Sequence, residues 1–405
     1  MQPTDLSSLV KKELQDFIVD HENADERKLV LRHKVIHGIP AAVVAAQISG
    51  RRKAKVKLPT WYQTHGMVYP PSVNLEQSSS EFTARFKANM IAETNTSNSM
   101  RGVDLTAGFG VDSFYLSRVC EKWDCVDPDF GLLEMAKHNH ELLGAANIHY
   151  HPTTAEGFIT SSHARFDFAF IDPARRSRSK KVFKLTDCEP NVVQILSSIF
   201  EKTDRLLVKA SPLLDLHQGC VELGRVEKII VVAVENECKE VLFWCTKDAI
   251  AEASVRCTNL SSGFPKIGLD EFTFTFSEEK TTTSVFSDPL TYLYEPNAAI
   301  LKAGAFKTVG RRYGFFKLHV NTHLYTSDQW DETFPGRIFK IEDLKPDPSR
   351  FRTRHGGKVN VFTRNYPFRP EQLKKKLKLQ DGGEKYLIGF SGEKKKYLVV
   401  AARLK

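Results

Sequence analysis

The sequence has no closely spaced cysteine pair and no long apolar run, and each absence excludes a class of protein. Its seven cysteines form no Cys-x-x-Cys pair and no Cys/His cluster with the spacing of a zinc site, so we expect reduced, mostly buried thiols and no metal. No stretch approaches the roughly 18 to 20 apolar residues of a membrane helix. The start, MQPTDLSSLVKKELQDF, lacks the basic-then-apolar order of a signal peptide. We therefore expect a cytosolic protein that does not span a membrane.

The basic charge is concentrated at one end of the chain. The 405 residues carry a formal net charge of +9, and residues 340–405 contain 18 Lys and Arg against 7 Asp and Glu. This segment therefore accounts for the whole basic excess. A concentrated basic face attracts polyanions, so nucleic acid is the expected partner. The alternative is a solvated lysine-rich helix that serves only solubility.

Residues 1–75 have the apolar spacing of helices. Apolar residues three and four positions apart predict one helix from Leu6 to Ile18. A second helix is expected to end near Gly50, because glycine commonly follows a helix. The basic run Arg51–Lys57 would then be a linker or a short exposed segment.

Residues 76–260 alternate between short apolar runs and helical segments. The first helix is expected to open at Ser78, because Ser78 and Glu81 have the spacing of a capping box. About seven strands follow, separated by helices, which predicts a mostly parallel sheet of Rossmann-like α/β type. Residues 270–335 and 336–405 mix strands with short helices and are expected to form two small α+β domains.

The stretch Met100–Asp112, MRGVDLTAGFGVD, carries the clearest chemical signal. An apolar run ends at Asp104 and enters a Gly-x-Gly turn, Gly108 and Gly110, where side chains would obstruct a ligand. A carboxylate at Asp104 can face an α-amino group but would repel a pyrophosphate. Ser113 stands where dinucleotide-binding proteins have a third glycine, which disfavours an oxidoreductase.

A second acidic residue at the end of an apolar run also indicates a ligand site. Asp127 follows the next apolar run, in CVDPDFG, 19 residues beyond Gly108. One carboxylate can accept hydrogen bonds from both hydroxyls of a ribose. The alternative for Asp127 alone is a helix cap before Pro128.

These motifs resemble class I S-adenosylmethionine-dependent methyltransferases, and the resemblance runs in order through roughly residues 75–250. It implies a seven-stranded class I methyltransferase core with S-adenosylmethionine as cofactor. In that family an acidic residue after the third strand meets the adenine; here Thr154 stands at that position and Glu156 two residues further on. The helix before the first strand often covers the methionine end. The residues that the resemblance assigns to the cofactor are Gln77, Ser78, Asp104, Thr106, Gly108, Gly110, Asp127, Ala155, Glu156 and Asp172.

The tetrapeptide Asp172-Pro173-Ala174-Arg175 ends the fourth apolar run of the core. It resembles the DPPY or DPPR signatures of enzymes that methylate bases, except that Ala174 replaces the second proline and Arg175 the aromatic. A carboxylate beside a fixed carbonyl can accept both hydrogens of an exocyclic amine, so that the amine is oriented without a strong base. The expected catalytic residues are Asp172, Pro173, Arg175 and Lys209, the last in VKASP at the end of the fifth run.

The residues after this tetrapeptide form a basic loop. Arg176, Arg178, Lys180 and Lys181 are expected either to clamp a phosphate or to lie in a solvated loop. Cys188 raises the separate possibility of covalent C5 methylation of a pyrimidine. The cysteine motif of those enzymes is missing after the fifth run, so this mechanism is disfavoured.

The C-terminal segment resembles the THUMP-like domain of a bacterial methyltransferase family. That family combines a helical N-terminal region, a class I core, a ferredoxin-like domain and the THUMP-like domain, and the phrases YEPNAAILKAGAF and RNYPF carry the likeness. THUMP domains in general bind structured RNA. Aromatic residues here alternate with guanidinium groups, as single-stranded or hairpin RNA recognition prefers. The expected RNA-binding residues are Arg364, Tyr366, Arg369, Lys374, Lys375 and Lys376.

We therefore expect a methyltransferase that acts on a base nitrogen in ribosomal or transfer RNA, with the C-terminal module binding the RNA. Two other functions stay open. One is an RNA-binding protein whose core binds the cofactor weakly or has lost catalysis, which the Ala174-Arg175 departure motivates. The other is a methyltransferase for a protein or a small molecule. The sequence leaves the oligomeric state and the methylated atom undetermined.

Overall fold

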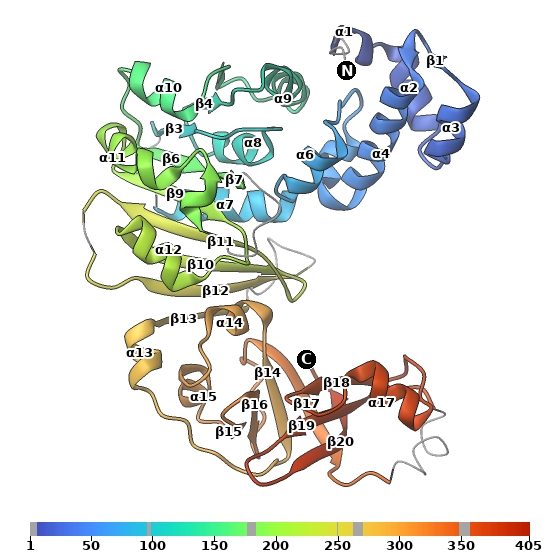
Figure 1. Cartoon of the computed structure of the whole chain (residues 1–405), viewed down its shortest axis with the longest axis vertical. Helices are drawn as coiled ribbons and strands as arrows, with labels where there is room; N and C mark the ends of the chain where they lie inside the picture. The colour runs from blue at the N-terminus through green and yellow to red at the C-terminus, as the bar shows by residue number, and fades with distance from the viewer. Residues whose placement is uncertain (1–5, 95–98, 176–183, 249, 262–269, 348–356) are drawn as a thin grey trace. The chain divides into compact units, whose positions relative to one another are not determined.

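The computed structural model describes residues 6–94, 99–175, 184–248, 250–261, 270–347 and 357–405 (Figure 1). It divides into two compact units. The first contains Met1–Glu227 and Leu242–Ala251, and the second contains Lys228–Val241 and Glu252–Lys405. No helix in the described part of the chain is long and apolar enough to cross a membrane.

A parallel sheet lies at the centre of the first unit. Its neighbouring strands are β9, β6, β3, β4 and β5, in that order, and each adjacent pair is parallel. The chain builds outward from β3 in one direction and from β6 in the other, so the topological switch point lies between these two strands. Ligands bind at the carboxyl ends of the strands at such a point. The strands are β3 (Arg101–Asp104), β4 (Lys122–Val126), β5 (Ile148–His151), β6 (Phe168–Ile171) and β9 (Arg205–Ala210).

Beyond β9 the sheet order continues with β11 (Glu237–Thr246), β10 (Val226–Val234), β12 (Ser254–Leu260) and β13 (Asp270–Thr275). The boundary between the two units passes through β10 and β11. Only Glu235 and Asn236, both with positive φ, connect β10 to β11, and so short a connection joins antiparallel neighbours. The seven core strands therefore have the order 3-2-1-4-5-7-6, which confirms the expected α/β fold. The last two strands extend the sheet beyond the expected seven.

Two helices of the core precede β3 and the others lie between the strands, and α7 begins later than expected. Helix α7 begins at Glu81 because Ser80 caps it, with Ser80 Oγ accepting from Thr83 N at 3.2 Å. The capping box of Ser78 with Glu81 is therefore wrong: Ser78 instead ends α6, and Glu81 accepts hydrogen bonds from Thr60. The helices are α6 (Ser72–Gln77), α7 (Glu81–Thr94), α8 (Val111–Ser117), α9 (Phe130–Leu142), α10 (Ala155–Ser161), α11 (Val192–Lys202) and α12 (Leu216–Leu223).

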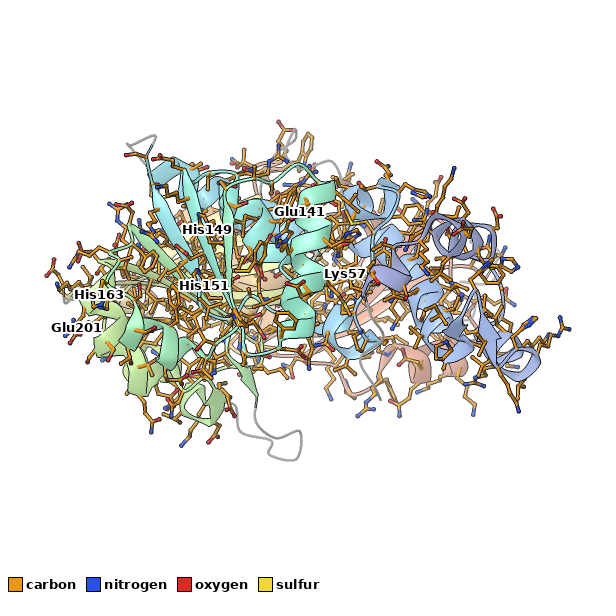
Figure 2. The ribbon with its side chains drawn as sticks, turned by 90° about the horizontal axis from the view of Figure 1, so that it is seen from above. Lys57, Glu141, His149, His151, His163 and Glu201 are labelled. Carbon is orange, nitrogen blue, oxygen red and sulfur yellow. The ribbon has the colours of Figure 1, made fainter. Side chains whose placement is uncertain are left out.

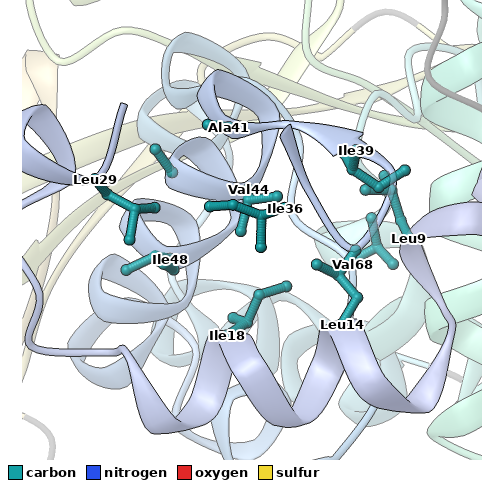
Figure 3. Close-up of a cluster of buried hydrophobic side chains, with 11 residues drawn as sticks. Leu9, Leu14, Ile18, Leu29, Ile36, Ile39, Ala41, Val44, Ile48 and Val68 are labelled. Atoms are coloured by element: carbon teal, nitrogen blue, oxygen red, sulfur yellow. The ribbon is translucent and has the colours of Figure 1, made fainter. Parts of the chain in front are cut away.

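The N-terminal helices of the first unit pack around their own apolar cluster, in which Leu14 and Ile18 face Val44 and Ile48 (Figure 3). The sequence predicted one helix from Leu6 to Ile18, but the chain forms two. The expected linker is also wrong, because one helix runs through Gly50 to Lys57. Gly50 is used for packing, since a Cβ there would lie 2.4 Å from Tyr69 Cβ. The elements are α1 (Leu6–Leu9), α2 (Lys12–Asp20), α3 (Glu26–Arg32), β1 (Val35–Ile36), β2 (Ile39–Pro40), α4 (Ala41–Lys57) and α5 (Pro59–Gln63).

A seven-stranded sheet forms the centre of the second unit, with the order β15-β16-β14-β17-β20-β19-β18. Strand β14 pairs antiparallel with both β16 and β17, so residues 270–335 and 336–405 both contribute strands to this sheet. Strand β18 forms one edge of this sheet and runs parallel to β19. The elements are α13 (Phe276–Thr281), β14 (Tyr292–Pro296), α14 (Ala298–Ala303), α15 (Thr308–Tyr313), β15 (Phe316–His319), β16 (Thr322–Ser327), β17 (Gly336–Asp343), β18 (Asn360–Arg364), α17 (Pro370–Leu377), β19 (Lys385–Ser391) and β20 (Lys396–Arg403).

Candidate cofactor and substrate site

Asp104 is the last residue of β3 and is almost completely buried at the switch point, with 1% of its surface exposed. Its Oδ1 accepts from Thr106 N at 2.9 Å and its Oδ2 accepts from Ser113 Oγ at 2.6 Å. Burial raises the pKa of Asp104 to about 7, although the two hydrogen bonds lower it. Near neutral pH a cationic group beside this carboxyl would favour its ionised form.

The two glycines after Asp104 serve different purposes. Gly108 has φ +52°, and its N–H donates to Asp127 Oδ2 at 2.8 Å. A Cβ on Gly108 would meet only Thr106 O at 4.0 Å, whereas a Cβ on Gly110 would lie 2.7 Å from the His140 ring. Gly108 therefore leaves space for a ligand, and Gly110 is required by packing against the protein.

The loop rests on an aromatic cluster that the sequence did not predict. His140 is fully buried; its Nε2 lies 2.9 Å from Gly110 O, and its Nδ1 lies 2.9 Å from Tyr150 Oη. A carbonyl oxygen only accepts, so Nε2 carries the proton, and burial lowers the pKa of His140 to about 4. Below the loop, the Phe109 ring lies 5.1 Å from the ring of Trp61 in α5. The N-terminal helices therefore support the loop directly.

Asp127 follows β4 and faces the same loop. Besides its bond to Gly108, it accepts from Asp129 N through Oδ1 at 2.9 Å. An ionised carboxylate has about four acceptor sites, so it retains capacity for two hydroxyl groups. Burial raises the pKa of Asp127 above its ordinary value. Ala155 and Glu156, the expected adenine contacts, lie in the first turn of α10, with Ala155 buried and Glu156 exposed.

Gln77 and Ser78, expected at the methionine end of the cofactor, lie at the end of α6. Gln77 is exposed, and Ser78 Oγ donates to Leu75 O at 2.8 Å. The next residue, Ser79, is buried, and its Oγ donates to Asp112 Oδ2 at 2.6 Å. Of these three residues, Ser79 is thus the one bonded to the helix that follows the glycine turn.

Asp172 follows β6, beside Asp104 across the switch point. Its backbone N–H donates to Thr106 Oγ1 at 2.6 Å, so the two strand-end loops are joined. Its side chain is 33% exposed, and its Oδ2 lies 2.5 Å from Lys209 Nζ at the end of β9. The structure thus brings together three of the predicted residues: Asp172, Lys209 and Thr106.

The chain after Asp172 folds back on itself in a short antiparallel pair. Strand β7 (Ala174–Arg175) pairs with β8 (Cys188–Glu189). The thiol of Cys188 is buried and donates to Lys184 O at 3.5 Å. Pro173 is half-buried just before the pair. The expected phosphate contacts Arg176, Arg178, Lys180 and Lys181 lie outside the described residues.

Two charged residues at this site were not predicted. Asp112, in the first turn of α8, lies 3.1 Å from Lys87 Nζ and 3.5 Å from Lys209 Nζ. Burial alone would raise the pKa of Asp112, but the two ammonium groups hold it below its ordinary value. Lys87 is fully buried in α7, on the face that also buries Phe86 and Met90. The only signal in the sequence is a lysine within an otherwise apolar face.

The expected RNA-binding residues of the second unit fall into two groups. Arg364 contacts the buried carboxylate of Glu295 on β14, with Nη2 2.5 Å from Oε1, and Arg337 contacts the other oxygen. Tyr366 packs over Gly389, and Lys374 pairs with Asp381 at 2.8 Å. The exposed members lie in or directly before α17; they are Arg369, Lys375 and Lys376.

A separate cavity of about 750 Å³ lies between α9 and β5, and Figure 2 labels Glu141, His149 and His151 at its border. Its lining includes Pro152 at the end of β5 but none of the three strand-end carboxylates. The cavity runs along the outer edge of the sheet, so we assign the chemistry to the carboxylates instead. No group of three His, Cys, Asp or Glu side chains in the described ranges could hold a metal ion.

The residues at the switch point fit a cofactor with an α-amino group and an adenosyl ribose. Asp104 offers a buried carboxyl for a cation, and Asp127 retains acceptor sites for hydroxyl groups. The space beside Gly108 admits a ligand where a side chain would otherwise stand. Backbone amides at the turn add donors.

Comparisons with known proteins find two domain families and several similar proteins. Residues 292–335 match a family described as a ferredoxin-like domain, and residues 336–403 match one described as THUMP domain-like. Two proteins of Mycobacterium tuberculosis, from strains CDC 1551 and H37Rv, are named uncharacterized S-adenosylmethionine-dependent methyltransferases. Each is 24% identical over 316 residues, which is 76% of this chain and 80% of the relative.

One solved structure is similar over nearly the whole chain. It is the crystal structure of a candidate methyltransferase from Porphyromonas gingivalis W83, with a TM-score of 0.85 and 29% identity. The match covers 99% of this chain and 100% of that one. The likeness therefore includes the N-terminal helices, the core and the C-terminal sheet.

Proposed function

We propose that this chain, an S-adenosylmethionine-dependent methyltransferase with ferredoxin-like and THUMP-like C-terminal domains, methylates a base nitrogen in structured RNA. The observation that carries the proposal is the placement of Asp172. Its backbone is bonded to Thr106 of the cofactor loop, and its carboxylate is held by Lys209. An acceptor thus lies beside the loop that receives the cofactor.

The chain's own residues orient the reacting groups. Bound S-adenosylmethionine supplies an electrophilic methyl group on a sulfonium. Asp104 and Asp127 hold the α-amino group and the ribose. The Asp172 carboxylate, together with the Pro173 carbonyl, accepts the hydrogens of a base amine. The nitrogen lone pair is thereby directed toward the methyl group. Orientation and exclusion of water provide most of the barrier reduction, so no strong base is required.

The proposed RNA surface lies on the second unit and is narrower than the sequence indicated. Arg364 is committed to Glu295, and Lys374 to Asp381. Three basic residues at helix α17 remain exposed: Arg369 at its N-terminus, and Lys375 and Lys376 within it. Lys376 Nζ lies 4.6 Å from the ring centre of Phe368. A basic surface with an adjacent aromatic ring suits phosphate and base contacts. Ribosomal and transfer RNA are the proposed substrates, which places the proposed reaction in the cytoplasm.

The transfer reaction tests the proposal directly. Purified protein is incubated with S-adenosylmethionine labelled with tritium in the methyl group and with total RNA from cells that lack the gene. We expect label in ribosomal or transfer RNA, and none with Asp172→Ala. Label in protein or in small molecules would favour the alternative substrates. Cofactor binding with no transfer to any fraction would favour an RNA-binding protein that has lost catalysis.

The RNA surface has its own test. Lys375→Gln together with Lys376→Gln removes two exposed charges, and we expect the affinity for bulk transfer RNA to fall. The slope of log affinity against log salt should decrease by about 1 to 2, because fewer counterions are released. The matched control is Lys394→Gln with Lys395→Gln, two exposed lysines in the turn between β19 and β20. Equal slopes for the two double variants would show that α17 is not the RNA surface.

A further inference from the structure

Two lysines and two aspartates form a series of ion pairs in the first unit, which leads from helix α7 to Asp172 after strand β6. Lys87 Nζ lies 3.1 Å from Asp112 Oδ1. Asp112 Oδ2 lies 3.5 Å from Lys209 Nζ, and Lys209 Nζ lies 2.5 Å from Asp172 Oδ2. The exposed fractions are 0% for Lys87 and 8% for both Asp112 and Lys209. This series of ion pairs therefore connects the interior of the unit to the partly exposed carboxylate of Asp172.

Asp112 is the carboxylate that the two lysines share. A buried ammonium group is costly unless an opposite charge lies beside it. Asp112 supplies that charge for Lys87 and helps to hold Lys209, which also pairs with Asp172. Asp112 is itself held by Ser79 Oγ at 2.6 Å. The ammonium group of Lys209 is therefore positioned in part by buried residues, Asp112 and the Ser79 side chain that holds it.

We propose that Asp112 is a positioning residue for methyl transfer. Through Lys209 it holds the Asp172 carboxylate in the orientation that accepts a substrate N–H, and Lys87 anchors Asp112. The inference rests on the proposed function, because it assumes that Asp172 receives the substrate. If Asp112 loses its charge, Lys87 and Lys209 lose the carboxylate they share. More of the positive charge of Lys209 then acts on Asp172, which weakens that carboxylate as an acceptor.

The first test compares Asp112→Asn with the double variant Lys87→Met/Asp112→Asn. Asparagine keeps an acceptor for Ser79 but removes the charge. We expect kcat for transfer to RNA to fall at least tenfold in the single variant, with KM for RNA changed less than twofold. The double variant also removes one ammonium group and should regain at least threefold in kcat. A merely structural role predicts the reverse, with the double variant slower than the single, and that result would overturn the proposal.

The second test does not depend on RNA. S-adenosylmethionine carries a positive sulfonium and S-adenosylhomocysteine does not, so calorimetry with both ligands reports the local charge. We expect Asp112→Asn to weaken the first at least threefold more than the second, and the double variant to restore the ratio. If the unmodified protein transfers nothing to RNA, the RNA proposal fails, and this ratio alone decides the inference. An unchanged ratio in a folded single variant would then contradict it.

Thermal unfolding identifies any variant that fails to fold. In that case Ser79→Ala takes the place of Asp112→Asn, because it removes the hydrogen bond to Asp112 and the bond that Ser79 Oγ accepts from Lys87 Nζ at 3.2 Å, but no charge. We expect kcat to fall about threefold with KM unchanged. A folded Ser79→Ala variant with unaltered kcat would count against the positioning role.

Discussion

Asp104 and Asp172 end neighbouring strands of one sheet, yet they depend on very different parts of the chain. Asp104 is 1% exposed, and its recorded hydrogen bonds come from Thr106 and Ser113, within nine residues. Asp172 is one-third exposed, and its carboxylate is held by Lys209, 37 residues away. Lys209 in turn contacts Asp112. The carboxylate of the cofactor half, Asp104, is thus held by neighbouring residues of the chain, whereas the carboxylate of the substrate half, Asp172, is held by a distant residue.

Substitutions in the two halves should affect different functions, cofactor binding and methyl transfer. This difference is the largest expected effect. Asp127→Ala removes the acceptor proposed for the ribose hydroxyls and should weaken S-adenosylmethionine binding about 100-fold, because hydrogen bonds to a charged group contribute roughly 1.5–3 kcal/mol each. Asp172→Ala should leave that binding within about threefold but reduce transfer to RNA by about 100-fold or more, as when one oriented group is removed from a transition state. Calorimetry and tritium transfer measure the two effects.

The matched control for this pair is Asp129→Asn. Asp129 lies two residues from Asp127 and caps α9, accepting from Leu132 N, and asparagine can still cap the helix. Cofactor binding by this variant should be unchanged. If Asp172→Ala weakened cofactor binding as strongly as Asp127→Ala, the division into two halves would be wrong.

A smaller effect concerns the stability of the cofactor half. Burial raises the pKa of Asp104 from 3.8 to about 7. The stability that this carboxyl contributes is therefore present below pH 3.8 and is lost as the pH rises through 7, by about 4 kcal/mol at most. Asp104→Asn should make the free protein more stable than the parent at pH 8 and should weaken cofactor binding at least tenfold. Denaturant unfolding at pH 5 and pH 8 measures the first effect.

The stability of Asp104→Asn at the two pH values can also contradict this prediction. If Asp104→Asn destabilised the free protein equally at both pH values, the carboxyl would be a structural group rather than one kept for a ligand. Asparagine can still accept from Thr106 N through Oδ1, and after rotation of the Ser113 hydroxyl its Nδ2 can donate to Ser113 Oγ. A loss of stability would therefore not follow from lost bonds alone.

The smallest effect concerns the support beneath the loop. Burial lowers the pKa of His140 from 6.5 to about 4, so its contribution to stability is present above pH 6.5 and is lost as the pH falls toward 4. The loss is about 3 kcal/mol at most. His140→Gln should show a shallower decline of unfolding free energy over this range than the parent protein. Parallel curves for the two proteins would contradict the buried, neutral histidine.

The same contrast explains what the sequence could predict. The strand-end aspartates, the glycine turn and the order of strands and helices are local patterns, and the fold and cofactor follow from them. Lys87 and Asp112 meet across 25 residues of chain, and no local pattern marks their pairing. Arg364 was assigned to RNA from its aromatic neighbours, but it contacts Glu295, 69 residues earlier. Those two residues lie in the phrases RNYPF and YEPNAAILKAGAF, so this buried ion pair joins the two stretches that carry the family likeness.

The most direct test of the account is a mass-spectrometric map of ribosomal and transfer RNA modifications in cells with the gene, without it, and with the Asp172→Ala variant. We predict one methylated base that is present with the gene, absent without it, and absent with the variant. An identical map in all three would contradict RNA methylation by this protein. A methylation that survived Asp172→Ala would contradict the assignment of the substrate site.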